Sequence, residues 1–133
     1  MDVVRFELRG TLGTGGAGTV YRAYDKQLQR EVALKLLRNA AGRDLYRFKR
    51  EFRALADIVH PNLVTLHELH ATDTDWYFTM DLVEGVSFID WVRPPRGAVG
   101  PMRRRQDILD SPVHEVRLRG ALVQLVDALI ALH

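Results

Sequence analysis

The sequence predicts an α+β fold, because two different periodicities occupy different parts of the chain. Apolar residues alternate with polar ones in short stretches within residues 6–83, which is typical of half-buried strands. Apolar residues recur every three or four positions in residues 46–59 and again in residues 118–132, which is typical of amphipathic helices. We therefore expect a sheet with one inserted helix, followed by helices towards the end of the chain.

Five strands are predicted from composition and alternation. They cover residues 6–12, 20–24, 31–37, 63–69 and 76–83. The first two flank a glycine-rich segment, so we expect the glycines to lie in a hairpin. A polar turn at residues 72–75 separates the last two strands.

The inserted helix is predicted over Tyr46–Val59, after a small polar connection at residues 39–44. Its apolar face consists of residues spaced four, three and four apart, and its other face is mostly basic. These apolar residues are Phe48, Phe52, Leu55 and Val59. The helix is expected to end before Pro61, because proline has no amide hydrogen and disfavours helix in the residue before it.

Two more helices are predicted in residues 84–133. Ser87 is expected to cap a short helix that ends at Trp91, and residues 94–101 are expected to form a loop. The last helix is predicted over Arg117–His133. Its leucines form one apolar stripe, and Val123, Val126 and Ile130 form a second.

The composition is that of an ordinary globular domain, with 133 residues, 47% hydrophobic and 27% charged. A net charge of +2 gives no argument for a nucleic-acid partner, and no stretch has the length of a membrane span. The absence of cysteine excludes disulfides and agrees with a cytoplasmic location. The five histidines lack metal-ligand spacing, so no metal site is predicted.

A glycine motif is the first candidate for function. Gly13, Gly15 and Gly18 match G-x-G-x-x-G, and Val20 extends the match to G-x-G-x-x-G-x-V. Glycine lets backbone amides approach phosphate oxygens closely, although a tight hairpin without a ligand is an alternative. The β-branched and aromatic residues after Gly18 predict a strand, which argues against a dinucleotide-binding helix, and no Gly-Lys-Ser/Thr follows as in a Walker loop.

Lys35 is the second candidate. It lies among apolar residues of the third predicted strand, where an ammonium group is costly unless it meets anions. Its side chain either extends to solvent or contacts phosphates and pairs with a carboxylate, and the glycine motif favours the second interpretation. Glu51 on the inserted helix is the candidate carboxylate, with Arg47 one turn earlier as an alternative partner for it.

In their order and spacing, these features resemble a eukaryotic-type protein kinase of the bacterial Ser/Thr kind. The residues that carry the resemblance are Gly13–Val20, Val32–Lys35, Arg47–Glu51 with Leu55, His60–Asn62 and Met80–Gly85. The resemblance covers essentially the whole chain. It implies a kinase small lobe in residues 1–83, with a five-stranded antiparallel sheet and one regulatory helix. Residues 84–133 would then hold the hinge, a short helix, a linker and the first long helix of an incomplete large lobe.

The resemblance also implies the roles of individual residues. Lys35 and Glu51 would form the catalytic pair, with Lys35 on the phosphates of ATP. Met80 would be the gatekeeper, and the backbone of Asp81 and Val83 would bond the adenine edge. The nucleotide-binding residues that it implies are Leu12, Gly13, Gly15, Gly16, Gly18, Val20, Ala33, Lys35, Met80, Asp81 and Val83. Magnesium would arrive with the nucleotide, and the substrate would be a protein.

Several kinase motifs are absent from the sequence. It contains no His-Arg-Asp loop with its downstream asparagine and no Asp-Phe-Gly, which hold the catalytic aspartate and the magnesium-binding side chains of the kinase pattern, and no Ala-Pro-Glu. We therefore expect a chain truncated before the catalytic loop and inactive by itself. A noncatalytic, pseudokinase-like nucleotide-sensing or scaffold fragment is the alternative.

The last helix and the basic linker lead to two further expectations. A helix that is apolar around most of its circumference belongs in a protein interior, so we expect it to be exposed here, to self-associate or to pack elsewhere. Arg103–Arg105 offers a basic cluster to phosphates or nucleic acid, but a solvated loop is the favoured interpretation, and no nucleic-acid partner is predicted.

Overall fold

A computed structural model describes residues 4–38, 42–94 and 112–133. The chain forms two compact units, Met1–Val83 and Glu84–His133. Residues 95–101 of the predicted loop at 94–101 and the basic cluster Arg103–Arg105 lie outside the described residues. The same holds for residues 39–41 of the predicted connection.

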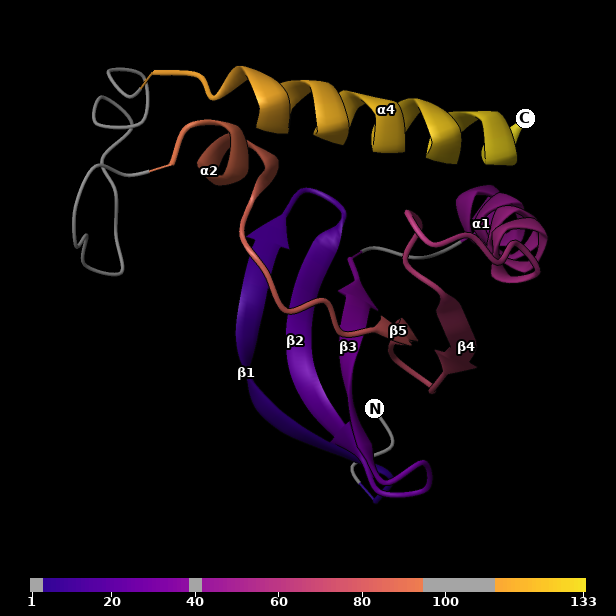
Figure 1. The fold of residues 1–133 in the computed structure, drawn as a ribbon. Helices are drawn as coiled ribbons and strands as arrows, with labels where there is room; N and C mark the ends of the chain where they lie inside the picture. Colours follow the sequence, from indigo (N-terminus) through magenta and orange to yellow (C-terminus); the bar gives the residue numbers. More distant parts are fainter. Residues whose placement is uncertain (1–3, 39–41, 95–111) are drawn as a thin grey trace. The chain divides into compact units, whose positions relative to one another are not determined.

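The first unit contains a five-stranded sheet in the order β1-β2-β3-β5-β4 (Figure 1). The strands are β1 (Phe6–Gly15), β2 (Gly18–Asp25), β3 (Arg30–Leu37), β4 (Leu66–Ala71) and β5 (Trp76–Asp81). Every neighbouring pair is antiparallel. The predicted five-stranded antiparallel sheet is therefore confirmed.

The glycine-rich segment lies inside the ladder between β1 and β2. Gly13 pairs with Val20, and Gly15 pairs with Gly18, so only residues 16–17 form the turn. The hairpin is confirmed, but both predicted strands were too short at this end. Glycine has low strand propensity, and the pairing partners across the ladder extend the strands in spite of it.

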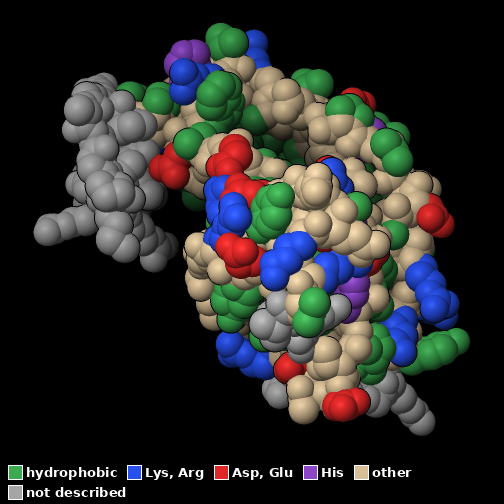
Figure 2. Space-filling model, turned by 90° about the horizontal axis from the view of Figure 1, so that it is seen from below, with side chains coloured by type: hydrophobic (Ala, Val, Ile, Leu, Met, Phe, Trp, Pro, Cys, Tyr) green, Lys and Arg blue, Asp and Glu red, His purple; other side chains and the backbone are tan. Residues whose placement is uncertain are grey.

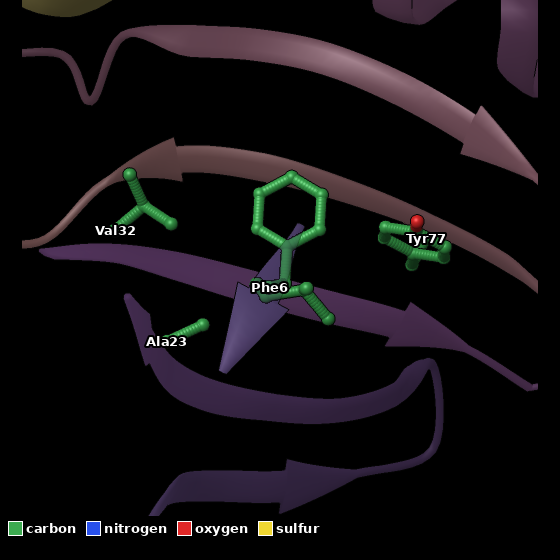
Figure 3. Close-up of a cluster of buried hydrophobic side chains, with 5 residues drawn as sticks. Phe6, Ala23, Val32 and Tyr77 are labelled. Atoms are coloured by element: carbon green, nitrogen blue, oxygen red, sulfur yellow. The ribbon is translucent and has the colours of Figure 1, made fainter. Parts of the chain in front are cut away.

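One face of the sheet carries the main hydrophobic core. Phe6, Ala23, Val32, Leu34 and Tyr77 form a buried cluster drawn from β1, β2, β3 and β5. Figure 3 shows the side chains of this cluster, four of which it labels. The Phe6 and Tyr77 rings meet edge to face at 6.0 Å between centroids. This packing joins β1 to the centre of the sheet.

A buried ion pair closes the start of the sheet. Asp25 is fully buried, and its two carboxylate oxygens accept bonds of 3.1 and 2.8 Å from the Arg5 guanidinium. The backbone amides of Gln27 and Leu28 donate to it as well. Burial by itself raises the pKa of Asp25, but the hydrogen bonds from Arg5 and from these amides bring the pKa below its usual value. Arg5 also bonds Glu68 of β4 at 2.7 Å, which lowers the pKa of Glu68.

The inserted helix α1 (Gly42–Ala56) lies beside β4 (Figure 1). Phe52 packs edge to face on Phe78 of β5 at 5.4 Å between ring centroids, and Phe48 lies 5.8 Å from the same ring. The predicted apolar face is correct at these two positions. The predicted bounds, 46–59, were wrong at both ends. The helix already includes residues 42–44, and it ends before Val59, which is 86% exposed.

The start of β4 also differs from the prediction. Residues 63–65 precede the strand, because a turn occupies the segment before them. The Leu63 amide donates to the His60 carbonyl at 3.1 Å, and the Asn62 amide donates to the His60 ring at 3.1 Å. His60 is thus a turn residue, and the strand begins only at Leu66.

The second unit contains α2 (Phe88–Val92) and α4 (Glu115–Leu132). Ser87 caps α2, as predicted, by accepting a bond from the Asp90 amide at 3.2 Å. The two helices meet where the His114 amide donates to the Val92 carbonyl at 2.7 Å. The Arg117 guanidinium lies 4.3 Å from the centre of the Trp91 ring.

Apolar side chains of α4 are largely exposed. The exposed residues are Val116, Leu122, Val123, Leu125, Val126, Leu129, Ile130 and Leu132. Ala128 is the buried residue of this helix. The expectation that this helix exposes its apolar side chains is confirmed. Within the described parts of the chain, no helix combines the length and apolar character that a bilayer crossing requires.

Candidate functional site

Among the four glycines of the motif segment, Gly18 is the position where only glycine fits. Gly18 has φ of +141°, which side chains rarely adopt, and a Cβ there would overlap the Leu36 carbonyl group of β3. At Gly13, Gly15 and Gly16, by contrast, a Cβ would meet nothing within 4 Å. Gly18 therefore allows β2 to approach β3 closely, while the other three glycines leave open space beside the hairpin backbone.

Four predicted site residues share one face of the sheet. Residues opposite each other in an antiparallel ladder project from the same face. Val20 pairs with Lys35, and Ala33 pairs with Met80. Because Ala33 and Lys35 are two positions apart on β3, all four side chains project from the face opposite the main core. The sheet thus places the Lys35 side chain among the apolar side chains of Val20, Ala33 and Met80.

Lys35 is half-buried on this face, between the paired residues Val20 and Phe78. In residues 4–38, 42–94 and 112–133 the structure contains no ion pair made by Lys35. Partial burial of an ammonium group costs desolvation free energy, and without a nearby anion this cost is not offset. Lys35 is therefore a group on this face that is suited to an external anion.

Glu51 does not bond Lys35 in this structure. Its Oε1 accepts a hydrogen bond of 3.0 Å from Arg47 Nε, one turn earlier on α1. Both side chains are exposed, 54% for Glu51 and 76% for Arg47. The expected Lys35–Glu51 contact is thus replaced by a local one, because an exposed carboxylate on a helix reaches a cation four residues away without any movement of the helix.

The end of β5 is the segment expected to contact adenine. The Asp81 amide donates to the Thr65 carbonyl at 2.9 Å, which ties this residue to the chain before β4. Asp81 also pairs with Val32 of β3. Val83 lies beyond the strand and is 67% exposed, and Leu12 on β1 is 49% exposed. Because β5 ends at Asp81, the backbone after this residue lies outside the ladder.

His67 was missed by the sequence analysis. Its Nε2 lies 2.7 Å from Asp81 Oδ1, and its side chain is only 10% exposed. The sequence contained a partial signal, since His67 alternates with apolar residues on a strand next to the predicted hinge strand. Alternation assigns His67 to a face of the strand, but it does not name the residue opposite.

Charges of both signs are interspersed on the face in Figure 2, where Lys and Arg side chains lie beside Asp and Glu side chains. This agrees with the net charge of +2. The residues that the structure describes include no group of three or more His, Asp or Glu side chains arranged to hold a metal ion. The site as described therefore consists of one lysine, apolar side chains and the backbone of the hairpin and strand end.

The fold and these motifs define the class of protein. The protein kinase domain family matches residues 6–133, so the chain belongs to the protein kinase family. It is similar to the N-terminal portion of the kinase domain of bacterial Ser/Thr kinases, with the small-lobe sheet and its helix in the first unit.

Individual relatives support this assignment. The chain is 29% identical to serine/threonine-protein kinase PrkC of Bacillus subtilis over 132 residues, 97% of this chain and 18% of the relative. It is 38% identical to serine/threonine-protein kinase PknF of Mycobacterium tuberculosis over 136 aligned positions, 95% of this chain and 28% of the relative. It is 41% identical to serine/threonine-protein kinase PknD of Chlamydia trachomatis over 86 residues, 62% of this chain and 9% of the relative. The chain thus spans less than a third of the length of these relatives.

Proposed function

We propose that this chain is the ATP-binding portion of a Ser/Thr protein kinase, whose complete reaction transfers the γ-phosphoryl group of ATP to a hydroxyl group of a protein. One observation carries the proposal. Lys35 is a half-buried cation without a carboxylate partner in the described residues, and it projects from the same face as Val20, Ala33 and Met80. A ligand with both anionic oxygens and a flat apolar base satisfies both parts of this face.

Different groups of this chain would contact different parts of the nucleotide. The hairpin backbone at Gly13, Gly15 and Gly16 has open space beside it, so phosphate oxygens can approach its amides. Lys35 neutralises charge on the phosphates, while Val20 and Ala33 offer apolar contact to the base. Magnesium would enter with the nucleotide and neutralise further charge on the phosphates.

Glu51 is proposed as the carboxylate that orients Lys35 once the nucleotide is bound. Its present bond to Arg47 is an exposed pair four residues apart on a helix, which contributes only about 0.3–0.5 kcal/mol. Such a pair is exchanged easily for a better one. We expect Glu51→Ala to weaken ATP binding about threefold, since the orienting charge is lost, and Arg47→Ala to leave it unchanged or slightly tighter. Equal effects of the two substitutions would argue against this role.

ATP binding tests the proposal directly. Calorimetric titration of the chain with ATP and magnesium should show saturable binding, and Lys35→Ala should weaken it at least about tenfold, because a charge-assisted contact is removed. Lys26→Ala is the matched control. It removes the same charge from the turn between β2 and β3, away from Val20 and Met80. Absence of ATP binding, or equal losses in both variants, would refute the proposal and favour a noncatalytic scaffold.

Phosphoryl transfer is a separate measurement. The sequence has no kinase catalytic-loop aspartate and no Asp-Phe-Gly motif, so we expect the 133 residues alone to transfer no phosphate from radiolabelled ATP to a serine-containing protein. Transfer that survives Lys35→Ala would point to chemistry that the kinase template does not use. We place the parent reaction in the cytoplasm, where ATP is available to a chain that needs no disulfide.

We propose a second copy of this chain, bound through α4, as a further partner. Eight large apolar side chains on this helix are exposed, and a second copy of the same helix is a partner with matching chemistry. Sedimentation equilibrium should show association that Val126→Glu and Ile130→Glu abolish. Gln124→Glu, on the same helix, adds the same charge at a polar position and should leave association unchanged. A monomer at all concentrations would exclude this contact.

A further inference from the structure

A histidine on β4 is bonded to the residue at the end of β5. His67 Nε2 and Asp81 Oδ1 are 2.7 Å apart, although 14 residues separate them along the chain. An ionised carboxylate only accepts hydrogen bonds, so the proton of this contact lies on Nε2. The Arg30 guanidinium lies 3.2 Å from the same nitrogen. A guanidinium group has no atom that accepts hydrogen bonds, so the Nε2 hydrogen of His67 is not shared with Arg30. Arg30 acts here as a neighbouring positive charge.

His67 is fixed more firmly than Asp81. The His67 side chain is 10% exposed, whereas that of Asp81 is 46% exposed. A buried ring has little rotational freedom, so it is the anchor of the pair and Asp81 is the group that is held. The bond therefore constrains the exposed residue at the end of the strand.

The bond adds to a backbone contact at the same point. Asp81 donates its amide to the Thr65 carbonyl at 2.9 Å, and Met80 pairs with Leu66. Thr65 and His67, which flank Leu66 in the sequence, thus both bond Asp81. Beyond Asp81 the chain leaves the ladder, so these two bonds lie at the end of β5 on its β4 side.

We propose that His67 is a positioning residue for the nucleotide base. By holding Asp81, it fixes the course of the backbone from Asp81 to Val83 that contacts the adenine edge. This inference rests on the proposed ATP-binding function. Asp81 pairs with Val32 of the main core, whereas Met80 and Lys35 project from the other face, so the Asp81 side chain that His67 bonds projects from the face opposite Met80 and Lys35. His67 therefore acts through Asp81 without touching the nucleotide. We expect it to affect the binding of the base and not that of the phosphates.

Three variants separate positioning from general stability. His67→Phe keeps a planar ring but removes the bond to Asp81. His67→Gln is the rescue variant, because its amide nitrogen can donate from near the place of Nε2. His70→Phe is the matched control, since His70 lies on the same strand but stacks on Tyr77 at 4.9 Å between ring centroids. Thermal unfolding of each variant establishes that it is folded before binding is measured.

Two ligands distinguish the base from the phosphates. We titrate the chain with ATP and with inorganic tripolyphosphate, each with magnesium. His67→Phe should weaken ATP binding roughly tenfold, as expected for loss of one charge-assisted bond, and change tripolyphosphate binding less than about twofold. His67→Gln should restore most of the ATP affinity, and His70→Phe should resemble the parent. Unchanged ATP binding in His67→Phe, or an equal loss for both ligands, would overturn the inference.

A measurement without nucleotide keeps this inference distinct from the proposed function. Amide hydrogen exchange of Asp81 should be about tenfold faster in His67→Phe and unchanged in His70→Phe, because the remaining bond to Thr65 opens more often. If the parent chain fails to bind ATP, the proposed function fails, and with it the role of His67 towards a base. If ATP binds but Asp81 exchange is the same in His67→Phe and the parent, the positioning role alone is refuted.

Discussion

Replacing Gly18 with alanine is expected to destabilise the small-lobe sheet by about 2–6 kcal/mol. Two structural terms contribute. A φ of +141° costs a residue with a side chain about 1–3 kcal/mol. The added Cβ would also overlap the Leu36 carbonyl oxygen and lie 3.0 Å from its carbon, and relieving such overpacking costs about 1–3 kcal/mol. The obstacle is backbone of β3, which cannot rotate away as a side chain would.

Gly16→Ala is the control for this prediction. Gly16 lies in the two-residue turn of the same hairpin, and a Cβ there meets nothing within 4 Å. We expect its free energy of unfolding to stay within about 0.5 kcal/mol of the parent. Urea unfolding followed by far-UV circular dichroism measures both variants. The reasoning is wrong if Gly18→Ala unfolds within about 1 kcal/mol of Gly16→Ala, because the close approach of β2 and β3 would then not require glycine.

Two further predictions concern the core of the first unit. The pKa values of Asp25 and its neighbour Glu68 lie below the usual carboxyl range, so their stabilisation is complete at neutral pH and is lost as the pH falls through their folded-state values. Asp25→Asn should cost about 3 kcal/mol at pH 7 and flatten the acid limb of stability against pH, and an unchanged acid limb would contradict this. Phe52→Ala should cost about 3–4 kcal/mol in urea unfolding, since Phe52 is 6% exposed, whereas Tyr46→Ala, at a position 73% exposed, should cost under about 1 kcal/mol.

Much of the fold was predictable because its causes are local. Alternation and strand-favouring composition identified β1, β2, β3 and β5, and the spacing of Phe48 and Phe52 identified the buried face of α1. Boundaries were less predictable. The hairpin strands extend through the glycines because partners across the ladder bond them, and β4 begins late because a turn centred on His60 occupies the preceding residues. Both effects depend on hydrogen bonds that periodicity does not contain.

The candidate site likewise has features that the sequence predicted and features that it did not. The glycine motif and Lys35 were identified from residue types and spacing, and the ladder places Lys35 opposite Val20 on one face of the sheet. The partner of Glu51 was expected to be Lys35, but the structure pairs it with Arg47. Residue types alone offered both choices, and the exposure of the carboxylate on α1 decided between them.

The sequence by itself determined the family, the strands and helices, and the cation and glycines of the candidate site, because each depends on residue type and on spacing along the chain. Only the tertiary structure decided which side chains meet. The bond from His67 to Asp81 and the buried pair of Arg5 with Asp25 join residues 14 and 20 positions apart. Such contacts depend on strand register and burial, which are properties of the folded sheet as a whole.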